Sequence, residues 1–141
     1  MQVDGACHCG YVTYAAEIDP AKVIICHCTD CQVLSSSAFR MIVLAEPGSF
    51  RLLSGSPTTY VKTAESGRKR AQVFCPRCGT QMYSTPGVEN PQHFGLRIGS
   101  IRQRAQLQPS RQLWRKSAFH WVDEIGSIPQ SDSATLTPLK A

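Results

Sequence analysis

The sequence predicts a mainly β fold that depends on bound metal. Most segments are short runs of alternating or β-branched apolar residues, which is typical of strands, and breakers such as Pro86-Gly87 separate them. Strands this short bury little apolar area, so a metal ion is expected to supply part of the folding free energy. All seven cysteines fall into three tight clusters, Cys7-x-Cys9, Cys26-x-Cys28-x2-Cys31 and Cys75-x2-Cys78.

The expected strands follow one another along most of the chain. Some alternate between apolar and polar residues, others are continuous apolar runs, and two flank the last cysteine cluster. Turn-forming residues such as Pro47-Gly48 and Pro86-Gly87 separate them. The strands are predicted at residues 11–17, 23–25, 39–45, 58–63, 70–74, 81–85 and 94–99.

Helices are expected to be few and short. Residues 29–36 form the main candidate, opened by Thr29-Asp30 as caps, and a turn is expected around residues 101–105. At 141 residues the chain has the size of one domain. We expect this domain to span residues 1–126, followed by a loosely ordered tail at residues 127–141, which is rich in Ser, Thr and Pro.

Charge and hydropathy argue against a nucleic-acid-binding protein and against a membrane protein. The net charge of +5 is concentrated in Arg68-Lys69-Arg70 and residues 97–116. These clusters are too short to indicate nucleic acid as a partner, but a modest positive potential attracts an acidic small molecule. The sequence shows no export signal and no run of eighteen apolar residues, so no membrane association is expected and the cytoplasm is the predicted location.

Cysteine spacing points to metal rather than disulfides. Two cysteines one or two residues apart would form a strained disulfide ring, yet both sulfurs can bind one tetrahedral ion. In a reducing compartment clustered cysteines are more often metal-bound or catalytic, and an odd count does not complete a disulfide framework. Zinc is therefore preferred over iron and over redox disulfides.

The first and last clusters predict a closed structural site. Cys75 and Cys78 bracket a tight turn. Gly79, which has no side chain, allows the backbone to bend so that amide groups approach the sulfur. Cys7 and Cys9 lie in a second turn flanked by glycines and complete a set of four thiolates. Four-coordinate thiolate sites of this kind hold a fold together.

The middle cluster predicts a different kind of site. Three sulfurs from one local segment, Cys26, Cys28 and Cys31, leave one position of a tetrahedral zinc open for water or substrate. The alternative is that one cysteine is not a ligand, or that a fourth ligand arrives from elsewhere. The candidates for this fourth ligand are His27, His93 and His120, although His27, like His8, lies within a C-x-C turn that is expected to direct its side chain away from the metal.

The combination of motifs resembles a known family. The segments GACHCGYVTY, VIICHCTDCQ and QVFCPRCGTQM, followed by Pro109-x2-Gln112-Leu113-Trp114-x2-Ser117-x3-Trp121, resemble the glutathione-dependent formaldehyde-activating enzymes, a family that includes centromere protein V. The likeness covers roughly residues 3–121. It implies a β-tent fold of several coiled antiparallel sheets, similar to the Rab exchange accessory proteins.

The resemblance also implies two zinc ions and an activity. One zinc would be structural, and the other would lie at the open site, where the three cysteines take the catalytic role. The implied enzyme is a carbon-sulfur lyase that combines glutathione with formaldehyde to give S-hydroxymethylglutathione. The sequence departs from the family pattern at Ser35-Ser36-Ser37 and at Gln112, where relatives commonly carry a Thr-Gly-Ser-like turn and a histidine, and both positions bear on the substrate.

Two functions are therefore compared. The first is a zinc-dependent lyase with a small thiol such as glutathione as its partner, and the second is a non-catalytic, zinc-stabilised module that binds a protein or a polyanion. Three thiolates give the open site a charge of −1, so an incoming thiolate would need cationic neighbours. The candidates are Arg40, Arg68 and Arg70.

Overall fold

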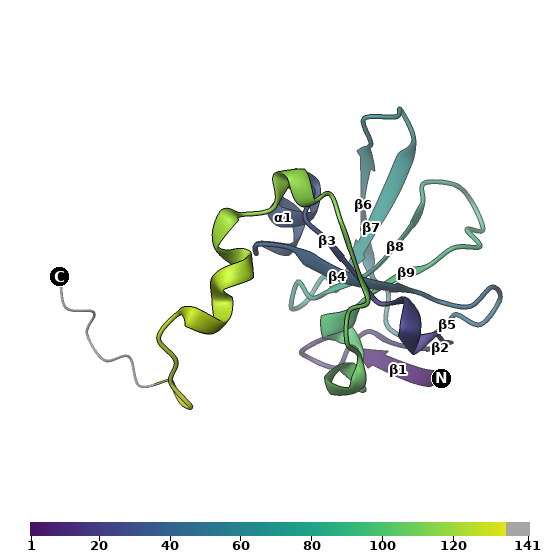
Figure 1. Ribbon diagram of the computed structural model, residues 1–141. Helices are drawn as coiled ribbons and strands as arrows, with labels where there is room; N and C mark the ends of the chain where they lie inside the picture. The colour runs from purple at the N-terminus through teal and green to yellow at the C-terminus, as the bar shows by residue number, and fades with distance from the viewer. Residues whose placement is uncertain (135–141) are drawn as a thin grey trace.

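The computed structural model describes residues 1–134 and arranges ten strands in two sheets, with one α-helix and several 3-10 turns (Figure 1). This confirms the mainly β prediction. In the described part of the chain no helix is long and apolar enough to span a membrane.

The smaller sheet contains three antiparallel strands in the order β1-β2-β5: β1 (Gln2–Ala6), β2 (Thr13–Glu17) and β5 (Arg51–Ser54). Gly5 of β1 pairs with Tyr14 of β2, so the tyrosine ring lies over a position without a side chain. The Tyr14 ring is fully buried, and its hydroxyl lies 2.9 Å from Ser100 Oγ.

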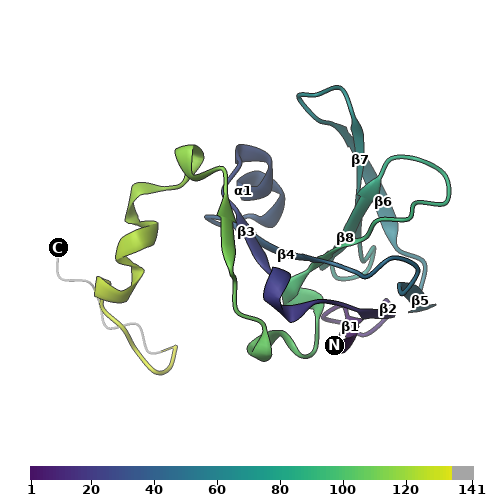
Figure 2. The ribbon, with the colours of Figure 1, turned by 45° about the vertical axis from the view of Figure 1, so that its right-hand side comes forward.

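The larger sheet contains seven strands in the order β10-β3-β4-β9-β8-β7-β6. All its pairings are antiparallel except that of β10 with β3. The β6–β7 hairpin projects from the body in both views (Figures 1 and 2). The bounds are β3 (Ile24–Cys26), β4 (Arg40–Leu44), β6 (Thr58–Thr63), β7 (Lys69–Phe74), β8 (Gln81–Pro86), β9 (Gly95–Arg97) and β10 (Arg111–Leu113).

Helix α1 (Thr29–Ser35) connects β3 to β4, close to the predicted range. The prediction that Thr29-Asp30 caps this helix is wrong. Cys28 occupies the N-cap position, and its sulfur accepts a hydrogen bond from the amide of Cys31. A sulfur therefore takes the place of the usual side-chain oxygen at this helix start.

The core lies between the two sheets. Residues of β1 and β2, such as Val3 and Tyr14, belong to the same buried cluster as Val73 of β7 and Leu96 of β9. An aromatic group extends it, because the rings of Phe50, Phe94 and Tyr83 pack against one another at centroid distances from 4.1 to 5.7 Å. The two sheets are thus joined by apolar contacts as well as by the first of the two cysteine clusters described below.

Several elements were not predicted or differ in extent. Strands β1, β5 and β10 were missed, and the predicted strand at 94–99 ends at Arg97, where a 3-10 turn begins. The predicted turn at 101–105 is a 3-10 turn over Arg104–Gln106. The 3-10 segments are η1 (Pro20–Lys22), η2 (Ile98–Ser100), η3 (Arg104–Gln106), η4 (Arg115–Ser117) and η5 (His120–Ser127).

The C-terminal segment leaves the body beyond β10. It passes α1 and extends away from both sheets, carrying η5 (Figures 1 and 2). This 3-10 helix, which the sequence did not predict, ends at Ser127. The tail predicted at residues 127–141 lies partly outside the described residues, because these end at residue 134.

Candidate metal centres

The first candidate centre joins cysteines from two turns of different sheets, and we call it the four-cysteine cluster. Cys7 and Cys9 follow β1, whereas Cys75 and Cys78 follow β7. Their sulfurs all lie within 4.8 Å of one another. The Sγ–Sγ distance is 3.6 Å between Cys7 and Cys9 and 3.8 Å between Cys9 and Cys75.

These distances fit a tetrahedral zinc ion. Four sulfurs at about 2.3 Å from zinc are separated by about 3.8 Å along each edge of the tetrahedron. Backbone amides approach the same sulfurs: Val12 N–H donates to Cys7 Sγ at 3.2 Å and Arg77 N–H to Cys75 Sγ at 3.4 Å. Such donors stabilise thiolates, the form in which cysteine binds metal.

The rim of the four-cysteine cluster also favours thiolate. Thr80 Oγ1 lies 3.2 Å from Cys78 Sγ, and hydrogen bonding from Thr80 is the main cause that lowers the pKa of Cys78 to about 5. Gly79, which precedes Thr80, has a φ of +78°, a backbone conformation that glycine adopts without strain. The sequence prediction of a tight turn at this position agrees with the geometry.

The second candidate centre is the three-cysteine cluster of Cys26, Cys28 and Cys31. Cys26 ends β3, Cys28 caps α1 and Cys31 lies in its first turn. The three sulfurs also lie within 4.8 Å of one another. Burial raises the pKa of Cys26 to about 12, so this thiol requires a positive charge beside it to lose its proton. A metal ion meets that requirement.

In the described part of the chain, the three-cysteine cluster has no fourth metal-binding side chain beside it. Among residues 1–134, no His, Cys, Asp or Glu atom joins the three sulfurs within 4.8 Å. His27 is fully buried, but its Nε2 donates to Gln112 Oε1 at 2.7 Å. His93 lines a separate cavity with Phe94, and His120 is exposed at the start of η5. The geometry therefore favours the open-site interpretation over a fourth histidine ligand.

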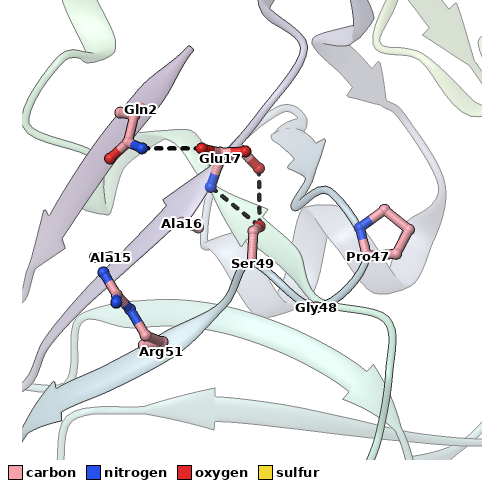
Figure 3. A pocket seen from close by; sticks show the side chains of 8 residues that line it. All are labelled: Gln2, Ala15, Ala16, Glu17, Pro47, Gly48, Ser49 and Arg51. Atoms are coloured by element: carbon pink, nitrogen blue, oxygen red, sulfur yellow. Dashed lines mark hydrogen bonds between the residues drawn. The ribbon is translucent and has the colours of Figure 1, made fainter.

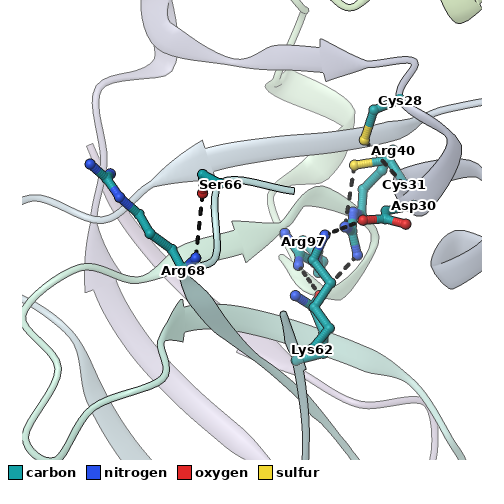
Figure 4. Close-up of polar contacts among 9 residues, drawn as sticks. Cys28, Asp30, Cys31, Arg40, Lys62, Ser66, Arg68 and Arg97 are labelled. Carbon is teal, nitrogen blue, oxygen red and sulfur yellow. Dashed lines mark hydrogen bonds and ion pairs between the residues drawn. The ribbon is translucent and has the colours of Figure 1, made fainter. Parts of the chain in front are cut away.

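A buried arginine contacts the three-cysteine cluster directly. Arg40 Nη2 donates to Cys31 Sγ at 3.2 Å, and Arg40 Nη1 donates to Gln72 Oε1 at 3.1 Å (Figure 4). Arg97 Nη2 donates to the same Gln72 oxygen at 2.8 Å. Burial, together with the neighbouring Arg40, lowers the pKa of Arg97 to about 9, so its guanidinium is still charged at neutral pH.

A cleft of about 570 Å³ borders Cys28. Its walls include Trp114 and Ser117. Lys62 and Asp30 also line it and form an ion pair (Figure 4). Trp114 has a φ of 60°, in the left-handed region, which is rare for a bulky residue. Backbone strain of this kind tends to occur at ligand sites.

The candidate cationic residues have different positions. Of the candidate cations, Arg40 contacts the three-cysteine cluster, whereas Arg68 is exposed and extends away from it (Figure 4). Asp30 is paired with Lys62 rather than capping α1. The sequence analysis missed Lys62 and Arg97. Arg97 lies in the buried strand β9, but the alternation of residues 94–99 gave no sequence signal that an arginine there would be buried.

A further cavity lies on the smaller sheet and contains no cysteine. It is lined by Glu17, Arg51 and Ser49 among others (Figure 3). Gln2 Nε2 donates to Glu17 Oε1 at 2.9 Å, and the Glu17 amide donates to Ser49 Oγ at 3.1 Å. Gln2, Glu17 and Ser49 thus bind one another across the region of β2 and β5.

Comparison with known proteins gives a family and a fold. The model of the family described as glutathione-dependent formaldehyde-activating enzyme matches residues 2–117. An uncharacterized lyase from Schizosaccharomyces pombe is 28% identical over 82 residues, which is 58% of this chain and 56% of the relative, so the match spans little more than half of the yeast protein. A crystal structure of a Rhodobacter sphaeroides protein is 21% identical, with a TM-score of 0.59, and covers 77% of this chain and 98% of its own. That structure shows a shared fold.

Proposed function

The chain belongs to the glutathione-dependent formaldehyde-activating enzyme family, and from this premise we propose that it is a zinc-dependent carbon-sulfur lyase acting on a small thiol-aldehyde adduct. The reference reaction joins glutathione and formaldehyde to give S-hydroxymethylglutathione. The observation that carries the proposal is the three-cysteine cluster with no fourth protein ligand beside it among residues 1–134. The yeast relative, named a lyase, supports the same reaction class.

The two cysteine clusters take different roles in this proposal. The four-cysteine cluster of Cys7, Cys9, Cys75 and Cys78 holds a structural zinc, and the three-cysteine cluster of Cys26, Cys28 and Cys31 holds the reactive one. A zinc ion with an open position lowers the pKa of a bound thiol and polarises a carbonyl oxygen. The proposal thus assigns two zinc ions to each chain.

Cationic residues around the three-cysteine cluster favour the binding of an anionic sulfur. Three thiolates leave the zinc site with a charge of −1, which opposes a further thiolate. The guanidinium of Arg40 contacts Cys31 and offsets this charge from within the protein. Lys62, with its side chain 19% exposed, is a second cation at the cleft and is held in place by Asp30.

The reaction balances without an additional reagent. The thiol sulfur attacks the aldehyde carbon, a carbon-sulfur bond forms, and the carbon-oxygen double bond becomes single. The thiol proton leaves to solvent, and the former carbonyl oxygen gains one proton. The lyase direction reverses these changes. In the cleft, Trp114 and Ser117 form the wall that confines the adduct beside Cys28.

The remaining assignments follow from the proposed chemistry. We place the protein in the cytoplasm, since a reducing compartment keeps both its cysteines and its substrate as thiols. We assign residues 1–126 to one catalytic domain. A small thiol is the proposed partner, in preference to nucleic acid, because the exposed arginines occur in short clusters.

Product formation tests the proposal. The full chain, purified with two zinc ions, should accelerate the appearance of S-hydroxymethylglutathione from carbon-13 formaldehyde and glutathione, followed by NMR. Cys28→Ser serves as the control, since it removes one sulfur of the three-cysteine cluster. Equal rates with the native protein, with Cys28→Ser and without protein would contradict the proposed lyase and favour the zinc-stabilised binding module.

A further inference from the structure

Two buried guanidinium groups share one hydrogen-bond acceptor next to the three-cysteine cluster. Arg40 is 7% exposed and Arg97 is 5% exposed, and both donate to the single side-chain oxygen of Gln72, itself 3% exposed. A guanidinium carries five N–H donors. The Nε atoms of both arginines have no partner among the described residues, so this pair has unused hydrogen-bonding capacity.

The charges of the pair are only partly matched. Among residues 1–134, no aspartate or glutamate forms an ion pair with Arg40 or Arg97. The sulfur of Cys31 accepts from Arg40, and the thiols of Cys31 and Cys26 lie close enough to Arg97 to interact with its charge. The amide oxygen of Gln72 carries no charge, so Arg97 is a buried cation with no carboxylate partner among residues 1–134. Burying an unpaired charge costs several kcal/mol, and an anionic ligand would offset this cost.

A cavity reaches both arginines from the surface. Its volume is about 910 Å³, within the range of about 300–1,000 Å³ found for small-molecule sites. Its rim carries the exposed Arg104 and the hydroxyl-rich turn at residues 35–37. Thr80 also lines the cavity and contacts the sulfur of Cys78 in the four-cysteine cluster. The cavity therefore lies between the two cysteine clusters, and the charges that line it are positive.

We propose that this cavity is a subsite for a carboxylate, with Arg97 as its buried recognition residue and Arg104 as a cation at its rim. A carboxylate can accept two parallel N–H bonds from one guanidinium. Under the proposed function, on which this step rests, the carboxylate belongs to the thiol substrate, so the protein selects acidic thiols. Arg40 links this subsite to the reactive centre, since it contacts both Gln72 and Cys31.

Four ligands test the inference without changing the protein: glutathione, S-methylglutathione and the diethyl ester of each, titrated into the zinc-loaded full chain by calorimetry. Loss of a charge-assisted hydrogen bond inside a protein should weaken binding about tenfold to a hundredfold. We therefore expect glutathione to bind at least about tenfold more tightly than its diethyl ester.

Variants identify the residue responsible. In Arg97→Gln the preference for acid over ester should fall to within about twofold, because the affinity for the acid falls and that for the ester does not. Arg97→Lys should retain part of the preference, since it keeps the charge and loses the two-pronged geometry. Arg68→Gln removes the same charge from an exposed side chain outside the cavity and should behave as the native protein.

The outcomes separate this inference from the proposed function. If glutathione and its diethyl ester bind the native chain equally, the cavity is not a carboxylate subsite, whatever the variants do. An acid preference that persists unchanged in Arg97→Gln assigns the recognition elsewhere and overturns the role of Arg97. Equal affinity for glutathione and S-methylglutathione contradicts the proposed thiol chemistry and leaves the acid-to-ester comparison intact.

Discussion

Replacing Cys75 by serine should unfold the protein. Cys75 is fully buried, and its sulfur lies 3.8 Å from that of Cys9, which belongs to the turn after β1. The four-cysteine cluster therefore ties the smaller sheet to the larger one. A structural zinc contributes about 10–16 kcal/mol of binding free energy that is coupled to folding. The net stability of a domain is only about 5–15 kcal/mol, so losing this site removes most or all of it.

Circular dichroism and zinc content of the purified variant provide the assay. Cys75→Ser should lose its cooperative urea transition and most of its bound zinc. Cys28→Ser is the matched comparison, because it makes the same change of sulfur to oxygen at the three-cysteine cluster. That cluster lies at one end of the larger sheet and does not join the two sheets. This variant should remain folded and bind about one zinc ion fewer. A soluble, cooperatively unfolding Cys75→Ser protein that keeps one zinc would refute the structural assignment.

Two further predictions concern stability. Gly5→Ala should lower the free energy of unfolding by about 1–3 kcal/mol in urea titrations, since the added carbon would lie 2.1 Å from the Tyr14 ring. An unchanged midpoint of the urea transition would show that β1 and β2 accommodate the methyl group without cost. Asp4→Asn should flatten the acid limb of the stability curve. A hydrogen bond from Gln103 is the main cause that holds the pKa of Asp4 below its usual range, so the stability it contributes is present above pH about 4 and is lost as pH falls through the lowered pKa. An identical acid limb in both proteins would contradict this.

The cysteine clusters were predictable because the cysteines of each motif lie only one or two residues apart in the sequence. Two cysteines separated by one or two residues are brought together by a single turn, whatever the rest of the fold does. Strand β6 (Thr58–Thr63) was also predicted with its observed bounds, since its alternation extends over six residues. Strands β5 and β10 were missed because neither shows a buried face: every residue of β5 is exposed, and β10 has three residues.

The surroundings of the three-cysteine cluster depend on tertiary structure. Arg97 lies 66 positions after Cys31 in the sequence, and only the pairing of β9 with β4 brings it near Arg40. An arginine in a short alternating strand is ordinarily expected on the solvent face, so periodicity alone assigns it to the surface. Lys62 meets Asp30 in the same way, through the β6–β7 hairpin. Local motifs thus predicted the cysteine clusters, whereas the charged residues around them required the fold.

The most direct test of the open zinc site is a spectroscopic titration of the cobalt-substituted protein with glutathione. The thiolate-to-cobalt charge-transfer band should grow as a fourth sulfur binds at the three-cysteine cluster, and S-methylglutathione should leave it unchanged. Because binding displaces the thiol proton, the apparent affinity should rise about tenfold per pH unit below the free thiol pKa of about 8.5. An unchanged band at saturating glutathione, or equal responses to both ligands, would show that the sulfur never reaches the metal held by Cys26, Cys28 and Cys31.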